Sequence, residues 1–130
     1  MELRNKDDIL LAIFIFKKDI TSGKNFFTDN KNEFQVASFS LNKGEEILRH
    51  YHPLQNRSIE FTSEVLVLFE GKIKVDIYDL DKKHIFTEII NSGDTVALFN
   101  GGHSLEILET SQFVEVKQGP YDEKTDKERF

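Results

Sequence analysis

The chain has 130 residues, enough for one domain that buries roughly two-thirds of its unfolded surface and too few for a second. Hydrophobic residues make up 38% of it and twelve residues are Phe, which favours a globular protein over a disordered one. The net charge is −6 and basic residues alternate with acidic ones, so we expect no nucleic-acid partner. The chain has no cysteine, so any metal must bind to nitrogen and oxygen ligands.

The only long apolar run is ILLAIFIF, at residues 9–16. It is much shorter than the roughly 20 residues that cross a bilayer, and the acidic residues before it are unlike a signal peptide, so we expect a cytoplasmic protein with no membrane partner. Its β-branched and aromatic residues are apolar on both faces, which predicts a strand covered on both sides. Either this chain's own core or a second subunit could cover the second face.

The next part of the chain is predicted to hold two strands. A polar turn at residues 21–25 precedes an alternating pattern at 34–41, which predicts a strand. A further strand is expected to carry His50 and His52 and to end at Pro53, because proline cannot donate a ladder hydrogen bond. In a strand, the two histidines would project from the same face about 7 Å apart and could converge on one point.

The strongest strand signal is EVLVLF, which begins at Glu64. The period-2 pattern predicts an inward face and an outward face, both largely apolar. The inward face is expected to consist of Glu64, Leu66 and Leu68. The outward face is expected to consist of Val65, Val67 and Phe69. A carboxylate that opens such a buried run needs a partner, and a metal cation would supply one.

The rest of the chain continues the pattern of short strands. A tight turn is predicted at 70–72, and the strands that follow are expected at 73–77, 85–90, 95–99, 105–108 and 113–117. About nine short strands without a convincing helix indicate an all-β sandwich or barrel, and a jelly roll satisfies this pattern. His84 lies in a charged connection and is expected to be exposed to solvent.

The C-terminal residues 121–130 are dominated by charged side chains. They could form a frayed tail, because chain termini disorder easily. Tyr121 and Phe130 could instead anchor the tail across the sheet.

Two sequence motifs point to a family. The pattern G-x(5)-H-x-H followed by E-x(6)-G resembles the first motif of the cupin superfamily, and it is fitted by Gly44, His50, His52, Glu64 and Gly71. The second cupin motif is matched loosely by GDTVALFNGGH, which has Gly93 and His103 in place but Phe99 where cupins have proline. The gap between the second histidine and the glutamate is longer than usual in cupins, so an inserted loop is expected at residues 53–63.

Longer phrases, among them LLAIFI, TSEVL, GKIKVDIYD and EVKQGPY, resemble a small family of uncharacterised cupins related to those found among polysaccharide biosynthesis genes. The resemblance covers nearly the whole chain. It implies a cupin double-stranded β-helix, a jelly-roll barrel, as a single domain of residues 1–130 with a core at about 9–118 and a charged tail at 121–130. It also implies a divalent metal ion, with iron, zinc, manganese and nickel as candidates. The implied ligands are His50, His52, Glu64 and His103.

Three functions are compatible with these residues, and none of them names a catalytic residue. Three imidazoles and a carboxylate would leave coordination positions open, as in a catalytic site. The metal could then activate a small polar substrate such as a nucleotide-linked sugar for isomerisation or epimerisation, or bind oxygen for a dioxygenase reaction. The pocket could instead hold a small ligand without chemistry, with Asn56 and Arg57 of the inserted loop in reach of it. In the third interpretation the metal is structural.

Two further interpretations concern single features. By itself, H-x-H is explained equally well by two partly buried structural histidines. The apolar surface of residues 9–16 and of Val65, Val67 and Phe69 exceeds what one thin sandwich can easily cover, so we also expect a homodimer.

Overall fold

A computed structural model describes all 130 residues, and the chain divides into two compact units. Unit 1 consists of Met1–Asp19 together with Phe61–Phe130, and unit 2 consists of Ile20–Glu60. Unit 2 is therefore an insertion in the sequence of unit 1, and each unit is described here by itself. The expectation of a single domain over residues 1–130 stays a prediction.

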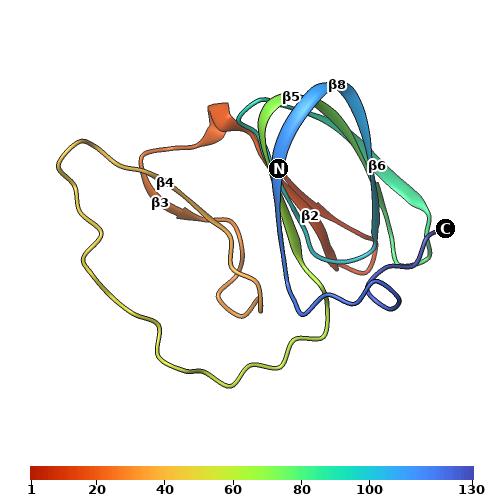
Figure 1. Ribbon diagram of the computed structural model, residues 1–130, viewed down its shortest axis with the longest axis horizontal. Coiled ribbons are helices and arrows are strands. Elements are labelled where there is room, and N and C mark those ends of the chain that lie inside the picture. Colours follow the sequence, from red (N-terminus) through yellow and green to blue (C-terminus); the bar gives the residue numbers. More distant parts are fainter. The chain divides into compact units, whose positions relative to one another are not determined.

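The regular elements are eight strands and one short 3-10 turn, which confirms the all-β prediction (Figure 1). Unit 1 contains β1 (Glu2–Arg4), β2 (Leu10–Ile15), the turn η1 (Lys17–Asp19), β5 (Glu64–Tyr78), β6 (His84–Asn91), β7 (Thr95–Leu98) and β8 (Gly102–Lys117). Unit 2 contains β3 (Gly23–Phe26) and β4 (Ala37–Ser40). No helix of the structure is long and apolar enough to cross a membrane.

The long strand β5 organises the sheet of unit 1. It pairs with β8 along its length, with β7 through Glu64–Val67 and with β6 through Lys72–Tyr78, always antiparallel. β2 joins this sheet through β7, and β1 joins through β2. The strands follow the path β1-β2-β7-β5-β6, with β8 on β5, and these pairings do not close the sheet on itself.

Two pairs of predicted strands are each one continuous strand in the structure. Residues 64–69 and 73–77 belong to one strand, β5, so the prediction of a turn at 70–72 is wrong. Residues 105–108 and 113–117 likewise belong to one strand, β8. Both strands bulge at the same level, where the β5–β8 register shifts between Leu68 and Ile73. A bulge bends a strand without ending it, and Figure 1 shows β5 and β8 curving together.

Gly71 occupies the centre of this bulge. Its φ is +100°, and a Cβ built there would lie 2.2 Å from the Ser111 Oγ and 2.4 Å from the Thr110 carbonyl oxygen. The backbone N–H of Gly71 donates to the Ser92 Oγ at 3.0 Å, and that of Lys72 donates to the Ser111 Oγ at 3.2 Å. Serine hydroxyls therefore replace the ladder partners that the bulge removes.

The hydrophobic core lies on one face of this sheet. Leu66 and Leu68 are almost fully buried while Phe69 is 63% exposed, which agrees with the predicted inward and outward faces. All six residues of β2 are buried within this chain, as predicted for a strand covered on both sides. The core cluster consists of Leu11, Ala12, Phe14, Leu66, Leu68, Ile73, Val75, Ile77, Ile90, Val96 and Leu98.

Unit 2 departs most from the sequence predictions. β4 is shorter than the predicted strand at 34–41, and β3 forms where a turn was expected at 21–25. The predicted strand through His50 and His52 is wrong, because residues 45–60 have no regular secondary structure. An extended segment becomes a strand only when a neighbour supplies ladder hydrogen bonds, and no segment pairs with this one.

We predict that Gly71→Ala lowers the free energy of unfolding by about 3 kcal/mol or more. The positive φ alone costs roughly 1–2 kcal/mol for a residue with a Cβ, and the β8 backbone must also move away. Gly93→Ala is the matched control, because its φ is +91° but its nearest neighbour is the flexible Lys17 side chain. Urea unfolding should show a loss of only about 1–2 kcal/mol for this control. Equal losses in the two variants would mean that the close approach of β8 is unimportant.

Candidate functional site

Glu64 and His103 meet in unit 1, although they are far apart in the sequence. Glu64 is the first residue of β5, two residues before buried Leu66, and therefore lies on the inward face. His103 pairs with Ile77, near the other end of β5. The His103 Nε2 lies 3.3 Å from the Glu64 Oε2, so the bent strand brings its two end regions to one place.

The turn before His103 depends on Gly101. Its φ is +75°, and a Cβ there would lie 2.2 Å from the Tyr78 carbonyl oxygen. Any larger residue would push the start of β8 away from the end of β5. Glycine therefore lets the chain turn sharply before the histidine.

The Glu64–His103 pair is partly shielded from solvent, with side-chain exposures of 13% and 33%. The hydrogen bond with His103 lowers the pKa of Glu64 below its ordinary value. Burial opposes this shift, while the positive charges of His103, Lys117 and Lys127 reinforce it. Glu64 is therefore held as a carboxylate, the form that can bind a cation or accept hydrogen bonds.

Lys117 and Asp126 extend this group. Lys117 is the direct cross-strand partner of Glu64, so the two side chains lie on the same face of the sheet. The Lys117 Nζ lies 2.7 Å from the Asp126 Oδ2, and their side chains are only 16% and 11% exposed. This hydrogen bond is the main cause of the raised pKa of Lys117. Sequence reasoning missed both residues, because nothing marks Asp126 among the many charges of the tail.

His50 and His52 lie in unit 2 and are exposed. Their ring centroids are 5.3 Å apart, so the two imidazoles are close together as predicted, although no strand carries them. The His50 Nδ1 lies 2.8 Å from the Leu48 carbonyl oxygen. Asn56 and Arg57 of the predicted loop are also exposed in this unit.

The structure thus brings the predicted metal ligands together in two pairs, one in each unit. It contains no group of three or more His, Asp or Glu side chains arranged to hold a metal ion. Because the two pairs belong to different units, the convergence of His50, His52, Glu64 and His103 on one ion stays a prediction.

A second polar cluster lies on the outward face of the same sheet. His84 is half exposed, in line with the prediction, but its Nε2 lies 2.9 Å from the Thr87 Oγ1 and 3.4 Å from the Asp76 Oδ1. Thr87 donates a hydrogen bond to Asp76, and this bond is the main cause of the lowered pKa of that carboxyl group. Only Asp76 and His84 could bind a metal here, so this cluster is a weaker candidate.

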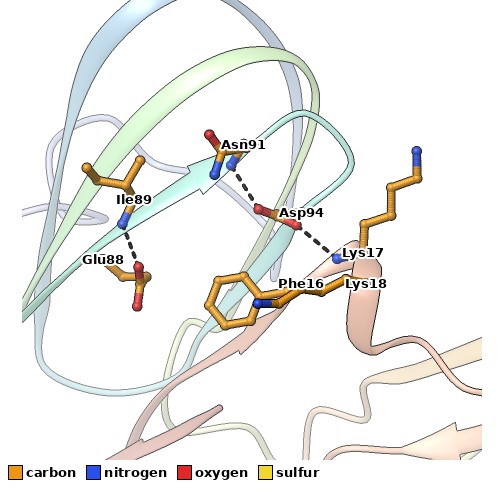
Figure 2. Close-up of a pocket in the computed structure, with 7 residues that line it drawn as sticks. All are labelled: Phe16, Lys17, Lys18, Glu88, Ile89, Asn91 and Asp94. Carbon is orange, nitrogen blue, oxygen red and sulfur yellow. Dashed lines mark hydrogen bonds between the residues drawn. The ribbon is translucent and has the colours of Figure 1, made fainter.

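A hollow of about 830 Å³ lies at the opposite end of β7 from Glu64, and its lining side chains are drawn in Figure 2. Its lining consists of Phe16, Lys17, Lys18, Glu88, Ile89, Asn91 and Asp94. The Asp94 carboxylate accepts hydrogen bonds from the backbone N–H groups of Lys17 and Asn91, both at 2.9 Å. Asp94 therefore holds the turn that carries it, and the hollow is separate from the Glu64–His103 pair.

Comparison of the chain with protein-family models found no match, and comparisons with curated proteins and with solved structures found none either.

We predict that Glu64 and His103 stabilise unit 1 as a coupled pair. In a double-mutant cycle of Glu64→Ala and His103→Ala, measured with a metal chelator present, the coupling energy should be about 0.5–3 kcal/mol. The exposed Lys72–Glu109 pair, 2.6 Å apart on the same two strands, is the matched control and should give about 0.5 kcal/mol or less. A Glu64–His103 coupling no larger than this control would contradict the prediction.

The coupling energy between Glu64 and His103 should depend on pH. Because the pKa of Glu64 is lowered in the folded state, its contribution is present above the pKa of the unfolded chain and is lost as pH falls through the folded pKa. The coupling should therefore shrink as pH falls below about 4.5, the ordinary pKa of a glutamate.

Proposed function

We propose that this protein is a metal-binding cupin with a jelly-roll fold that uses a divalent ion to act on a small polar substrate in the cytoplasm. The observation that carries the proposal is the 3.3 Å approach of Glu64 and His103, one from each of the two cupin-like motifs. The curved antiparallel sheet with one apolar face supports the fold. The absence of cysteine fits a reducing compartment.

The proposed ligands are Glu64 and His103 from unit 1 and the His50–His52 pair from unit 2. One carboxylate and three imidazoles suit iron, zinc, manganese and nickel. When bound, such an ion polarises a carbonyl or hydroxyl group, as in the isomerisation or epimerisation of a nucleotide-linked sugar, or binds oxygen for a dioxygenase reaction. Glu64 is already held ionised, and the histidines must be neutral to bind, so metal binding should weaken below about pH 6.

A non-catalytic protein that binds a small ligand is the second candidate function, and there the metal has a structural or regulatory role. One observation favours it: the histidines of unit 2 lie in a segment without regular structure. Rigid elements hold a catalytic constellation more accurately than loops do.

We predict one divalent ion per chain in the purified protein. Replacing His50 and His52 together by Ala should abolish metal binding and leave a folded, less stable protein, because hydrophobic burial dominates the stability. His84→Ala is the control and should keep its metal, since His84 lies on the outward face. Elemental analysis gives the metal content, and circular dichroism tests the fold. Undiminished metal in the double variant would defeat the assignment, and complete unfolding would favour a structural metal.

We also propose that the protein is a homodimer. All residues of β2 are buried within the chain, so this strand supplies no exposed apolar surface for a dimer interface. The outward face of β5 and β8 does supply such surface, because Phe69, Val114 and Val116 are exposed and Val67 is half-buried. Val67 and Val114 are direct cross-strand partners and form one patch.

Light scattering tests this proposal. The wild type should have about twice the 15.1 kDa mass of the chain. Val67→Lys should shift the equilibrium toward the monomer, and so should Phe69→Lys at a more exposed position where folding is less affected. Leu80→Lys, on an exposed turn of unit 1, is the control and should remain dimeric. A wild-type mass near 15.1 kDa at every accessible concentration would show that the chain is a monomer.

A further inference from the structure

The C-terminal tail, residues 121–130, crosses the end of the sheet that carries Glu64 and His103. Asp126 pairs with Lys117, which is the cross-strand partner of Glu64 at the start of β5. The ring of Phe130 meets the ring of Tyr78, the last residue of β5, with centroids 5.3 Å apart. In Figure 1 the tail, in the darkest blue, runs along one end of the sheet from the end of β8. Of the two predicted alternatives for the tail, a frayed end and an anchored segment, the structure shows the anchored segment.

The Lys117–Asp126 pair differs from the other lysine ion pairs of the sheet. In the Lys72–Glu109, Lys74–Glu106, Lys74–Asp76 and Lys82–Glu128 pairs the lysine side chain is at least 33% exposed, whereas both members of the Lys117–Asp126 pair are at most 16% exposed. Removing charges from water is costly, so a shielded ammonium requires an anion at hydrogen-bond distance. Asp126 supplies that anion from a segment that has no regular secondary structure.

The surroundings of Lys117 suit an exchangeable anion. Its Nζ lies 4.3 Å from the centroid of the Tyr121 ring and 2.7 Å from Asp126, and both of these partners belong to the tail. On the sheet itself, Glu64 is the direct cross-strand partner of Lys117, and the negative charges of Glu64 and Glu115 help to raise the pKa of Lys117. If the tail moved away, it would leave an ammonium with three donors beside the Glu64 carboxylate.

We propose that Lys117 is the subsite for an anionic group of the ligand, a carboxylate or a phosphate, and that Asp126 occupies this subsite when no ligand is bound. The tail is then an internal competitor that covers the Glu64–His103 pair and is displaced by an anionic ligand. The proposed subsite rests on the proposed function only in that Glu64 and His103 are taken as metal ligands. An anion can bind to Lys117 without a metal. It assigns the ligand class as a small acid or a phosphorylated compound, including a nucleotide-linked sugar.

A tethered carboxylate competes at an effective concentration in the millimolar range. A free anion therefore binds to the wild type with an affinity reduced by the fraction of molecules whose tail is closed. Removing the charge of Asp126 removes this competition, whereas removing the charge of Lys117 removes the subsite.

The test is to titrate the protein with inorganic phosphate, and separately with acetate, in the presence of a metal chelator. Binding is measured from the change in the amide chemical shifts. Asp126→Asn should lower the Kd for the better anion by about tenfold relative to the wild type, and Lys117→Met should abolish binding in either background. Phe130→Ala loosens the other end of the tail without touching Lys117 and should also tighten binding. Glu128→Gln is the matched control, because it removes the exposed pair with Lys82 from the same tail and should leave the Kd unchanged.

Tighter binding of phosphate would assign a phosphate group to the ligand, and tighter binding of acetate would assign a carboxylate. Equal affinities of the wild type and Asp126→Asn, or unchanged binding in Lys117→Met, would overturn the proposal. The metal content of Lys117→Met separates the two hypotheses. Loss of anion binding with the metal retained supports the subsite, and absence of metal from every variant refutes only the metal site.

Discussion

The bend of β5 at Gly71 is the constraint on which the rest of unit 1 depends. A straight strand of this length would hold Glu64 and Tyr78 far apart, at about 3.3 Å per residue. The bulge lets one continuous strand pair with β7 at its start, with β6 at its end and with β8 throughout. It also brings the Glu64 carboxylate within 3.3 Å of the His103 ring. Sheet architecture and candidate site thus share one cause, a residue without a Cβ where β8 passes close to β5.

The charged side chains around Glu64 depend on one another. His103 keeps Glu64 ionised, Lys117 lies beside Glu64, and Asp126 neutralises Lys117. Each group would be costly to shield alone, because an unpaired charge loses its hydration without compensation. The arrangement therefore links the order of the tail to the electrostatics of the Glu64–His103 pair, and a ligand that satisfies one group changes the environment of the next.

Motif spacing identified part of the candidate site. Glu64 and His103 were predicted together, and the structure pairs them. The imidazole rings of His50 and His52 lie close together as predicted, but the strand expected to carry them does not form. Lys117 and Asp126 were not predicted, because their significance comes from a cross-strand register and from the path of the tail, and neither leaves a local pattern in the sequence.

The sequence by itself determined the all-β class, the positions of most strands in unit 1 and the face on which Leu66 and Leu68 are buried. These follow from period-2 alternation, a local property that a strand shows whatever its partners are. Only the tertiary structure decided that residues 70–72 continue a strand instead of turning, that residues 45–60 stay irregular, and that the tail is held at Lys117 and Tyr78. Each of these outcomes depends on whether a distant segment supplies hydrogen bonds, burial or countercharge, and the local sequence does not specify that segment.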